Sequence, residues 1–201
     1  AFRRSCRSNQ ASLKNQSLSW KCPRQGLQGG VYQDMNGANK ATPTALGGLR
    51  LLEISSMVAA PFCGKLLASL GADVIKIEPP KTGDPSRRRG PFPGDVPHPE
   101  RSGLFLYLNT GKKSLTLDLN DHQGRKILGE LTENVDVLIH DLPPIRASEW
   151  GLGQDQLAAA LPDLISAAIT PYGSNGPYSD YAASDINIFH AGGEGNLLPN
   201  G

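Results

Sequence analysis

The sequence predicts an α/β protein with a Rossmann-like parallel sheet and flanking helices. Two observations support this fold class. Short runs rich in Val, Ile and Leu alternate with segments of helical periodicity, and turn-forming residues separate them. The first strand, helix and second strand also fit within about thirty residues, which is the span of a βαβ unit. Because the two strands of such a unit run in the same direction, the sheet is expected to be parallel.

The first βαβ unit is expected in residues 49–78. A strand at 49–54 is bounded by a glycine pair and a serine pair. The helix expected at 59–70 has Pro61 in its first turn and Gly71 just after its end, where these residues favour helix boundaries. The second strand ends at a proline pair, because proline cannot donate to a strand ladder.

After this unit comes a long loop at 79–102, rich in Pro, Gly and Arg. Loops of this length inside a domain are usually functional or disordered. The alternation then resumes, with a strand expected at 114–119, a helix at 120–135, a strand at 136–140, a helix at 154–161 and a strand at 164–169.

The charge distribution separates a head from the rest of the chain. Residues 1–34 carry six basic side chains and one acid, which leaves a net charge of −4 on residues 35–201. An Arg- and Ser-rich, acid-poor head is typical of an organelle transit peptide. A nucleic-acid-binding arm and non-native coding sequence are the two alternatives. We therefore expect residues 1–45 to be a basic, disordered or non-native head, and 46–201 to be the domain.

Composition excludes several function classes. The mildly acidic domain gives no electrostatic reason to expect a nucleic-acid partner. No apolar run reaches the roughly 18 residues that a membrane-spanning helix requires. The three cysteines form neither a disulfide framework nor a zinc-ligand spacing, which favours a reducing, cytoplasmic compartment. An organelle matrix is the alternative if residues 1–34 are a transit peptide.

The common motifs of nucleotide and metal sites are also missing. The first strand-to-helix turn, residues 55–61, contains no glycine, so its backbone is not suited to approach a dinucleotide pyrophosphate. The four histidines form no metal-ligand cluster, and we expect no metal. A single histidine at a strand end, such as His140, is expected to be a hydrogen-bonded structural residue.

Two segments allow both a structural and a functional interpretation. Arg87-Arg88-Arg89 is either a solvated loop or a clamp for the phosphates of a nucleotide, since guanidinium groups match phosphate geometry. The glycine-dense residues 191–195 are either a helix terminus with a turn or a nest of backbone amides for an oxyanion.

Several segments together resemble one family, the class III CoA-transferases. The most specific are Leu-Gly-Ala-Asp-Val-Ile-Lys-Ile-Glu at 70–78 and Asn-x-Gly-Lys-Lys-Ser at 109–114. The remaining matches, in the same order and spacing, are residues 48–53, 60–61, 83–84, 117–119, 136–139, 172–173, 176–178 and 185–187. The resemblance covers roughly residues 46–201.

This resemblance implies the N-terminal part of an acyl-CoA:carboxylate CoA-transferase, an incomplete large domain of the class III fold. It implies a CoA thioester as substrate, a carboxylic acid as acceptor, no tightly bound cofactor, and an interlocked homodimer when the protein is full length. In this family an aspartate attacks the thioester to give a mixed anhydride. The family's nucleophilic aspartate lies in a Gly-Asp motif downstream of the glycine-rich segment, and no residue of this sequence matches it, so no catalytic residue is assigned.

The resemblance also suggests residues for CoA contact: Met57, Ala59, Arg87, Arg88, Lys112, Lys113, Leu117 and Asp185. Two nucleotide-contacting arginines of the formyl-CoA transferase branch correspond to Pro79 and Glu149 here. Arg87 to Arg89 and the lysine pair would then supply the compensating charge. The alternatives are an α-methylacyl-CoA racemase-like isomerase and an inert truncated product. Ser184, where the racemase branch has histidine, counts against the racemase.

Overall fold

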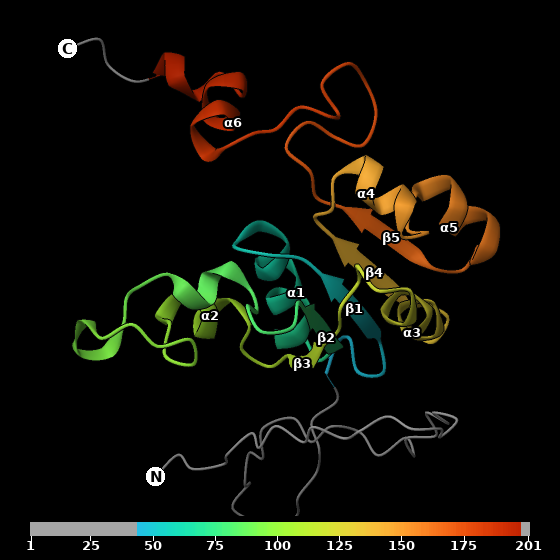
Figure 1. Ribbon diagram of the computed structural model, residues 1–201, viewed down its shortest axis with the longest axis horizontal. Helices are drawn as coiled ribbons and strands as arrows, with labels where there is room; N and C mark the ends of the chain where they lie inside the picture. Colours follow the sequence, from blue (N-terminus) through green and yellow to red (C-terminus); the bar gives the residue numbers. More distant parts are fainter. Residues whose placement is uncertain (1–43, 198–201) are drawn as a thin grey trace, which may run out of the picture.

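A computed structural model describes residues 44–197, and the basic head at 1–45 lies almost entirely outside the described residues. The described chain contains one parallel five-stranded sheet in the order β3-β2-β1-β4-β5 (Figure 1). This confirms the predicted α/β fold class. The strands are β1 (Arg50–Ile54), β2 (Asp73–Glu78), β3 (Lys113–Thr116), β4 (Val137–His140) and β5 (Ile165–Ala168).

Helices cover both faces of the sheet. On one face α1 (Ala59–Ser69) packs against Leu51, Val74 and Ile139. On the other face lie α3, α4 and α5, with Leu52 and Leu138 in the shared core. Their bounds, with those of the remaining helices, are α2 (Gly103–Leu108), α3 (His122–Thr132), α4 (Pro144–Glu149), α5 (Gln154–Ala160) and α6 (Asp185–Ala191), and the 3-10 turns are η1 (Pro85–Arg88), η2 (Pro93–Asp95) and η3 (Glu194–Leu197).

Strand β1 lies in the centre of the sheet, and this position explains why its sequence does not alternate between apolar and polar residues. Leu51 and Leu52 are both fully buried although their side chains point to opposite faces. A strand that is covered by helices on both sides needs apolar residues in succession, as parallel sheets usually do. Burial on each face therefore holds α1 and α3 against the same strand.

The structure differs from the sequence prediction in three places. The strand expected at 114–119 ends at Thr116, and Leu117 continues into the loop while packing on the core. Two short helices were not predicted. Helix α2 begins at Ser102, whose hydroxyl accepts a hydrogen bond from the amide of Phe105 at 3.1 Å. Helix α4 begins at a proline pair, which suits a first helical turn.

The strand order sets the expected position of a ligand. From β1 the chain adds β2 and β3 on one side and then β4 and β5 on the other. The connections after β1 and β4 therefore diverge at the carboxyl ends of these two strands, which is where open α/β sheets bind ligands.

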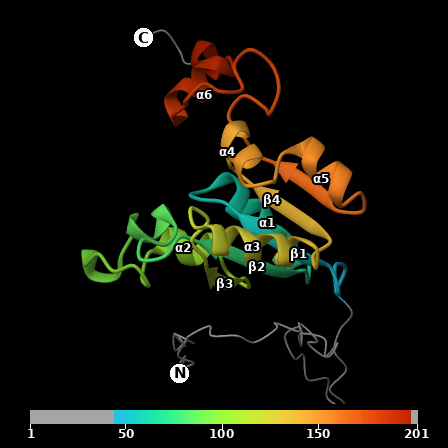
Figure 2. The same cartoon turned by 45° about the vertical axis from the view of Figure 1, so that its right-hand side comes forward.

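Helix α6 contacts η3, and the two extend away from the sheet in both views (Figures 1 and 2). Within residues 44–197, no helix combines the length and the apolar character that crossing a bilayer would need.

Candidate functional site

The connections after β1 and β4 diverge at the carboxyl ends of these two strands, and we call this place the switch point of the sheet. The turn that connects β1 to α1 lies there. Met57 has a φ of 60°, a left-handed conformation that costs a residue other than glycine roughly 1–2 kcal/mol. Two carboxylates hold the turn. The amide of Ser56 donates to Asp141 Oδ2 at 2.7 Å, and the amide of Met57 donates to Asp84 Oδ1 at 3.2 Å. Contacts from distant residues therefore stabilise a backbone conformation that the local sequence does not favour.

The next amides of the chain are free. No acceptor among residues 44–197 takes a hydrogen bond from the amides of Val58, Ala59 or Ala60, and no side chain caps this end of α1. Amides at a helix N-terminus carry a partial positive charge and bind anions or carbonyl oxygens. The site can thus accept a polar group of a ligand at the start of α1.

A buried ion cluster lies between α1 and the sheet. Glu53 and Lys76 are neighbours in the β1–β2 register, so their side chains lie on the same face. Lys76 Nζ is 2.9 Å from Glu53 Oε1 and 2.9 Å from Asp84 Oδ2. Lys112 Nζ lies 2.7 Å from Glu53 Oε2 and donates to the carbonyl of Pro61 at 2.7 Å. Two cations and two anions therefore balance inside the fold, each with at most 1% of its side chain exposed.

The cluster changes the protonation of its members. Burial on its own would raise the pKa of Asp84, but the Lys76 charge and the hydrogen bonds from Lys76 and Ser86 outweigh it and lower that pKa. For Lys112, burial is the largest effect and lowers its pKa, while the Glu53 charge opposes this. Asp141 differs, because burial raises its pKa more than the hydrogen bonds from Ser56 lower it.

The loop at 79–102, which carries Arg87 to Arg89 and is called the arginine loop below, is anchored by a second ion pair. Arg87 Nε lies 2.7 Å from Glu78 Oε2, and its Nη2 donates to Glu78 Oε1 at 2.8 Å. The guanidinium also stacks on the Phe105 ring at 3.6 Å and pairs with Glu100. Burial would raise the pKa of Glu78, but the bonds from Arg87, Ser114 and the Asp84 amide lower it to about 2.

We expect this pair to contribute to acid stability. A folded-state pKa of about 2, against an ordinary 4.5, means that the contribution is complete above pH 4.5 and is lost as the pH falls toward 2. Its size is about 3 kcal/mol, from the 1.36 kcal/mol that each pKa unit represents. Urea unfolding of the wild type and Glu78→Gln at several pH values measures it. The stability difference should shrink as the pH falls below 4.5, and a difference independent of pH would contradict the assignment.

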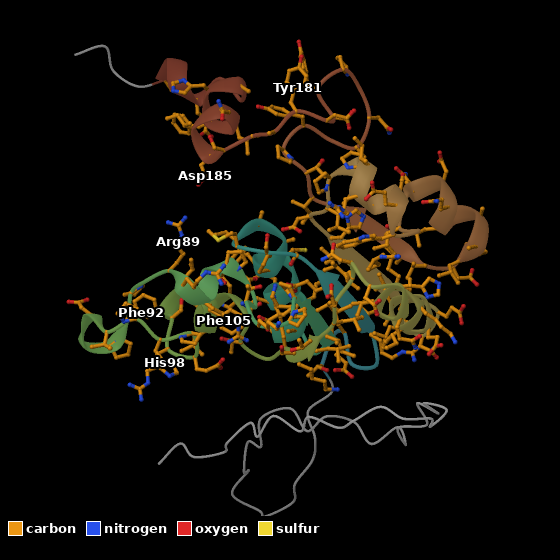
Figure 3. All side chains as sticks on the ribbon, in the orientation of Figure 1. Arg89, Phe92, His98, Phe105, Tyr181 and Asp185 are labelled. Carbon is orange, nitrogen blue, oxygen red and sulfur yellow. The ribbon has the colours of Figure 1, made fainter. Side chains whose placement is uncertain are left out.

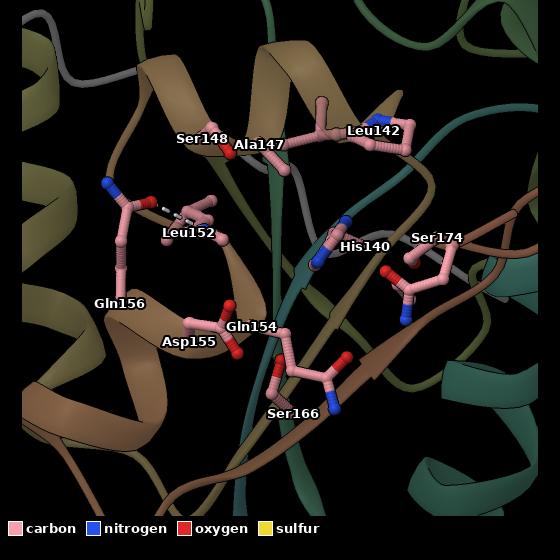
Figure 4. Close-up of a pocket in the computed structure, with 14 residues that line it drawn as sticks. His140, Leu142, Ala147, Ser148, Leu152, Gln154, Asp155, Gln156, Ser166 and Ser174 are labelled. Atoms are coloured by element: carbon pink, nitrogen blue, oxygen red, sulfur yellow. Dashed lines mark hydrogen bonds between the residues drawn. The ribbon is translucent and has the colours of Figure 1, made fainter. Parts of the chain in front are cut away.

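A hollow of about 550 Å³ opens beside the carboxyl ends of β4 and β5 (Figure 4). Its lining is mostly polar and comes from β4, α4, α5, β5 and the loop after β5, including His140, Ser148, Gln154, Ser166 and Asn175.

The prediction that His140 is hydrogen-bonded is wrong for its Nδ1 atom. Its Nδ1 is buried and has no hydrogen-bond partner among the described residues, and burial lowers its pKa. A neutral imidazole thus lines the hollow.

The eight predicted contact residues separate into three groups. Met57 and Ala59 lie at the switch point, and the Arg88 guanidinium is exposed and donates to the carbonyl of Thr82 at 2.8 Å. In contrast, Arg87 and Lys112 are paired inside the protein.

The other three residues lie apart from the switch point. Lys113 is at the amino end of β3, where it pairs with Asp73 at 2.7 Å, and Leu117 packs on the core. Asp185 begins α6, and Figure 3 shows Arg89 pointing away from the sheet on the side where α6 lies. Lys112, the β1–α1 turn and the arginine loop thus all contact the same buried ion cluster. Lys113 lies away from this cluster.

Sequence reasoning missed the four residues that organise the site: Glu53, Lys76, Asp84 and Asp141. A signal was present for the first two, since each is a charged residue inside an apolar central strand. Charged side chains are rarely buried unless they are paired. The carboxylates of Asp84 and Asp141 gave no such signal, because both lie in loops. Among residues 44–197, no group of three or more His, Cys, Asp or Glu side chains is placed to hold a metal ion.

An open parallel sheet with a free helix end at its switch point defines a ligand-binding α/β domain, and comparison with known proteins gives its family. The model of CoA-transferase family III matches residues 46–197. The chain therefore belongs to CoA-transferase family III.

Relatives and solved structures agree with this assignment. The chain is 38% identical over 145 residues to a succinyl-CoA–D-citramalate CoA-transferase of Chloroflexus aurantiacus, covering 72% of this chain and 35% of that protein. It is 34% identical over 171 residues to the mouse succinyl-CoA:glutarate CoA-transferase, covering 84% of this chain and 38% of the relative. The crystal structure of Rv3272 from Mycobacterium tuberculosis superposes with a TM-score of 0.68 at 35% identity, over 78% of this chain and 43% of that one. The chain thus spans little more than a third of the length of these curated relatives.

Proposed function

We propose that the full-length protein is an acyl-CoA:carboxylate CoA-transferase and that this chain supplies part of its CoA site. Family membership supports the reaction class, and both curated relatives described above are named as succinyl-CoA-dependent CoA-transferases. The observation that carries the proposal is local. The amides of Val58, Ala59 and Ala60 are free at the switch point of a parallel sheet, which is where such folds bind ligands.

The chemistry requires a thioester carbonyl, a nucleophilic carboxylate and a group that stabilises negative charge. Attack of the carboxylate on the thioester forms a mixed anhydride and releases the CoA thiolate. The thiolate then attacks the enzyme's carbonyl of the anhydride, so that the first acid leaves as a carboxylate and CoA is held as an enzyme thioester. The acceptor carboxylate attacks this thioester to form a second anhydride, and the released thiolate attacks its acceptor carbonyl, which gives the new acyl-CoA and restores the enzyme carboxylate. Amide donors stabilise the oxyanion that develops during attack. We assign no residue of this chain as the nucleophile.

Within this proposal the predicted contact residues have different tasks. Met57 and Ala59 place their backbone against CoA, and Arg88 offers an exposed guanidinium for a phosphate group. Arg87 and Lys112 act indirectly, because their charges are paired with Glu78 and Glu53. Contacts from Lys113, Leu117 and Asp185, an interlocked dimer and the absence of a tightly bound cofactor remain predictions. The compartment also remains a prediction: the cytoplasm, or an organelle matrix if residues 1–34 are a transit peptide.

Trapping the anhydride tests the reaction class. The full-length protein is incubated with succinyl-CoA and hydroxylamine, without and then with a dicarboxylic acid acceptor. We expect succinyl hydroxamate and an equal amount of free CoA without acceptor, both above the amounts formed without protein, and a new acyl-CoA when acceptor is present. Exchange of the α-proton of a branched acyl-CoA with solvent deuterium, with no acyl transfer, would instead indicate a racemase. Ser184 argues against that outcome, since it lies before α6 as an exposed helix cap.

A further inference from the structure

The β1–α1 turn is held by side chains that come from both neighbouring strands. Asp84 follows β2, and Asp141 follows β4, and these two strands flank β1 in the sheet. Their carboxylates accept hydrogen bonds from two successive amides, those of Met57 and Ser56. The bond to Asp84 spans 27 residues of sequence and the bond to Asp141 spans 85, and both therefore hold the same turn.

Each carboxylate is itself fixed in place. Asp84 Oδ2 is 2.9 Å from Lys76 Nζ, and its Oδ1 also accepts from the amide and the hydroxyl of Ser86 at 2.7 Å. Asp141 is held through its backbone, whose amide donates to the carbonyl of Ile54 at 3.2 Å, and its Oδ2 accepts from both the amide and the hydroxyl of Ser56. Two anchored acceptors on adjacent amides leave the turn little freedom to change conformation.

We propose that Asp84 and Asp141 are positioning residues that clamp the left-handed turn at Met57 and thereby aim the free amides of Val58 to Ala60 at the CoA substrate. This inference rests on the proposed function. The two hydrogen bonds also occupy the amides of Ser56 and Met57, so these amides are not available to a ligand phosphate as they are in glycine-rich turns of similar sheets.

Asp141 offers the cleaner test, because Asp84 also belongs to the buried ion cluster. In the full-length protein, Asp141→Ala is expected to raise KM for acyl-CoA about tenfold, with kcat and the KM of the acceptor acid changed by less than about threefold. Asp141→Asn should restore most of the acyl-CoA KM, because an amide oxygen still accepts from Ser56. Loss of folded enzyme alone would lower the apparent kcat and leave KM unchanged.

Asp136→Ala is the matched control. Asp136 is also an aspartate beside β4 that accepts from a β1 amide, that of Arg50 at 2.8 Å, but it lies at the amino end of the sheet. Its substitution should leave the acyl-CoA KM within about twofold. In a Met57→Gly background the Asp141→Ala effect should shrink, since glycine adopts this φ without strain.

An acyl-CoA KM that is the same in Asp141→Ala and in the wild type would overturn the clamp while leaving the transferase proposal intact. An equal rise in KM for Asp136→Ala would overturn it as well. A wild-type enzyme that forms no new acyl-CoA from succinyl-CoA and an acceptor acid would instead refute the proposed function.

Discussion

Substitution of Gly64 by alanine is expected to cost at least about 3 kcal/mol of the free energy of unfolding. Gly64 lies in α1 and is buried, and a Cβ at this position would overlap Glu53 Oε2 and lie 3.3 Å from Lys112 Nζ. The helix would have to move away from the sheet, or the Glu53–Lys112 pair would have to break. Either change leaves charge poorly compensated inside the protein, where charges cannot be solvated.

Urea unfolding of the full-length protein, followed by circular dichroism, measures this effect. Gly129→Ala is the control, because Gly129 lies in α3 and a Cβ added there would meet no atom within 4 Å among the described residues. That variant should be neutral or stabilised by up to about 1 kcal/mol, from the helix propensity of alanine. Equal stability of the Gly64 and Gly129 variants would show that α1 does not press on the ion cluster.

The second large effect is expected for Lys76→Met. This change removes the ammonium that bridges Glu53 and Asp84, while the methionine side chain has a similar volume. Lys112 would then remain as the only cation facing two buried carboxylates among the described residues. Breaking a buried pair by removing one partner typically costs about 3–5 kcal/mol, and we expect a loss in that range.

Lys113→Met gives the matched comparison, since it makes the same substitution in a pair that is open to solvent. The Lys113 side chain is 49% exposed, and that of its partner Asp73 is 30% exposed. Exposed pairs contribute between 0 and about 1 kcal/mol. If chemical denaturation gave the two variants the same midpoint, the buried cluster would not be a main source of stability.

The fold was predictable because hydrophobic patterns specify a parallel sheet largely one strand at a time. Residues 50–54 and 137–140 are largely aliphatic segments between turns, and the structure places both in the middle of the sheet. Boundaries were less certain where a loop continues an apolar pattern, as Leu117 does after β3. Short helices such as α4 have too few residues for a period to be seen.

The site was only partly predictable, because its contacts join residues that are far apart in sequence. Lys112 and Arg87 looked like free positive charges, and only the fold reveals Glu53 and Glu78 as their partners. The absence of glycine in the first turn argued against a dinucleotide, but it could not show that Met57 adopts a left-handed conformation. That conformation depends on Asp84 and Asp141, which are fixed by tertiary structure.

Hydrogen–deuterium exchange of the full-length protein with and without CoA tests most directly whether the substrate binds at the carboxyl end of the sheet. The predicted result is slower exchange in peptides that contain Val58 to Ala60 and in those that contain residues 141–143, with no change in α3. Protection that was confined to the amino ends of the strands, or that left the start of α1 unaffected, would contradict the site described for this chain.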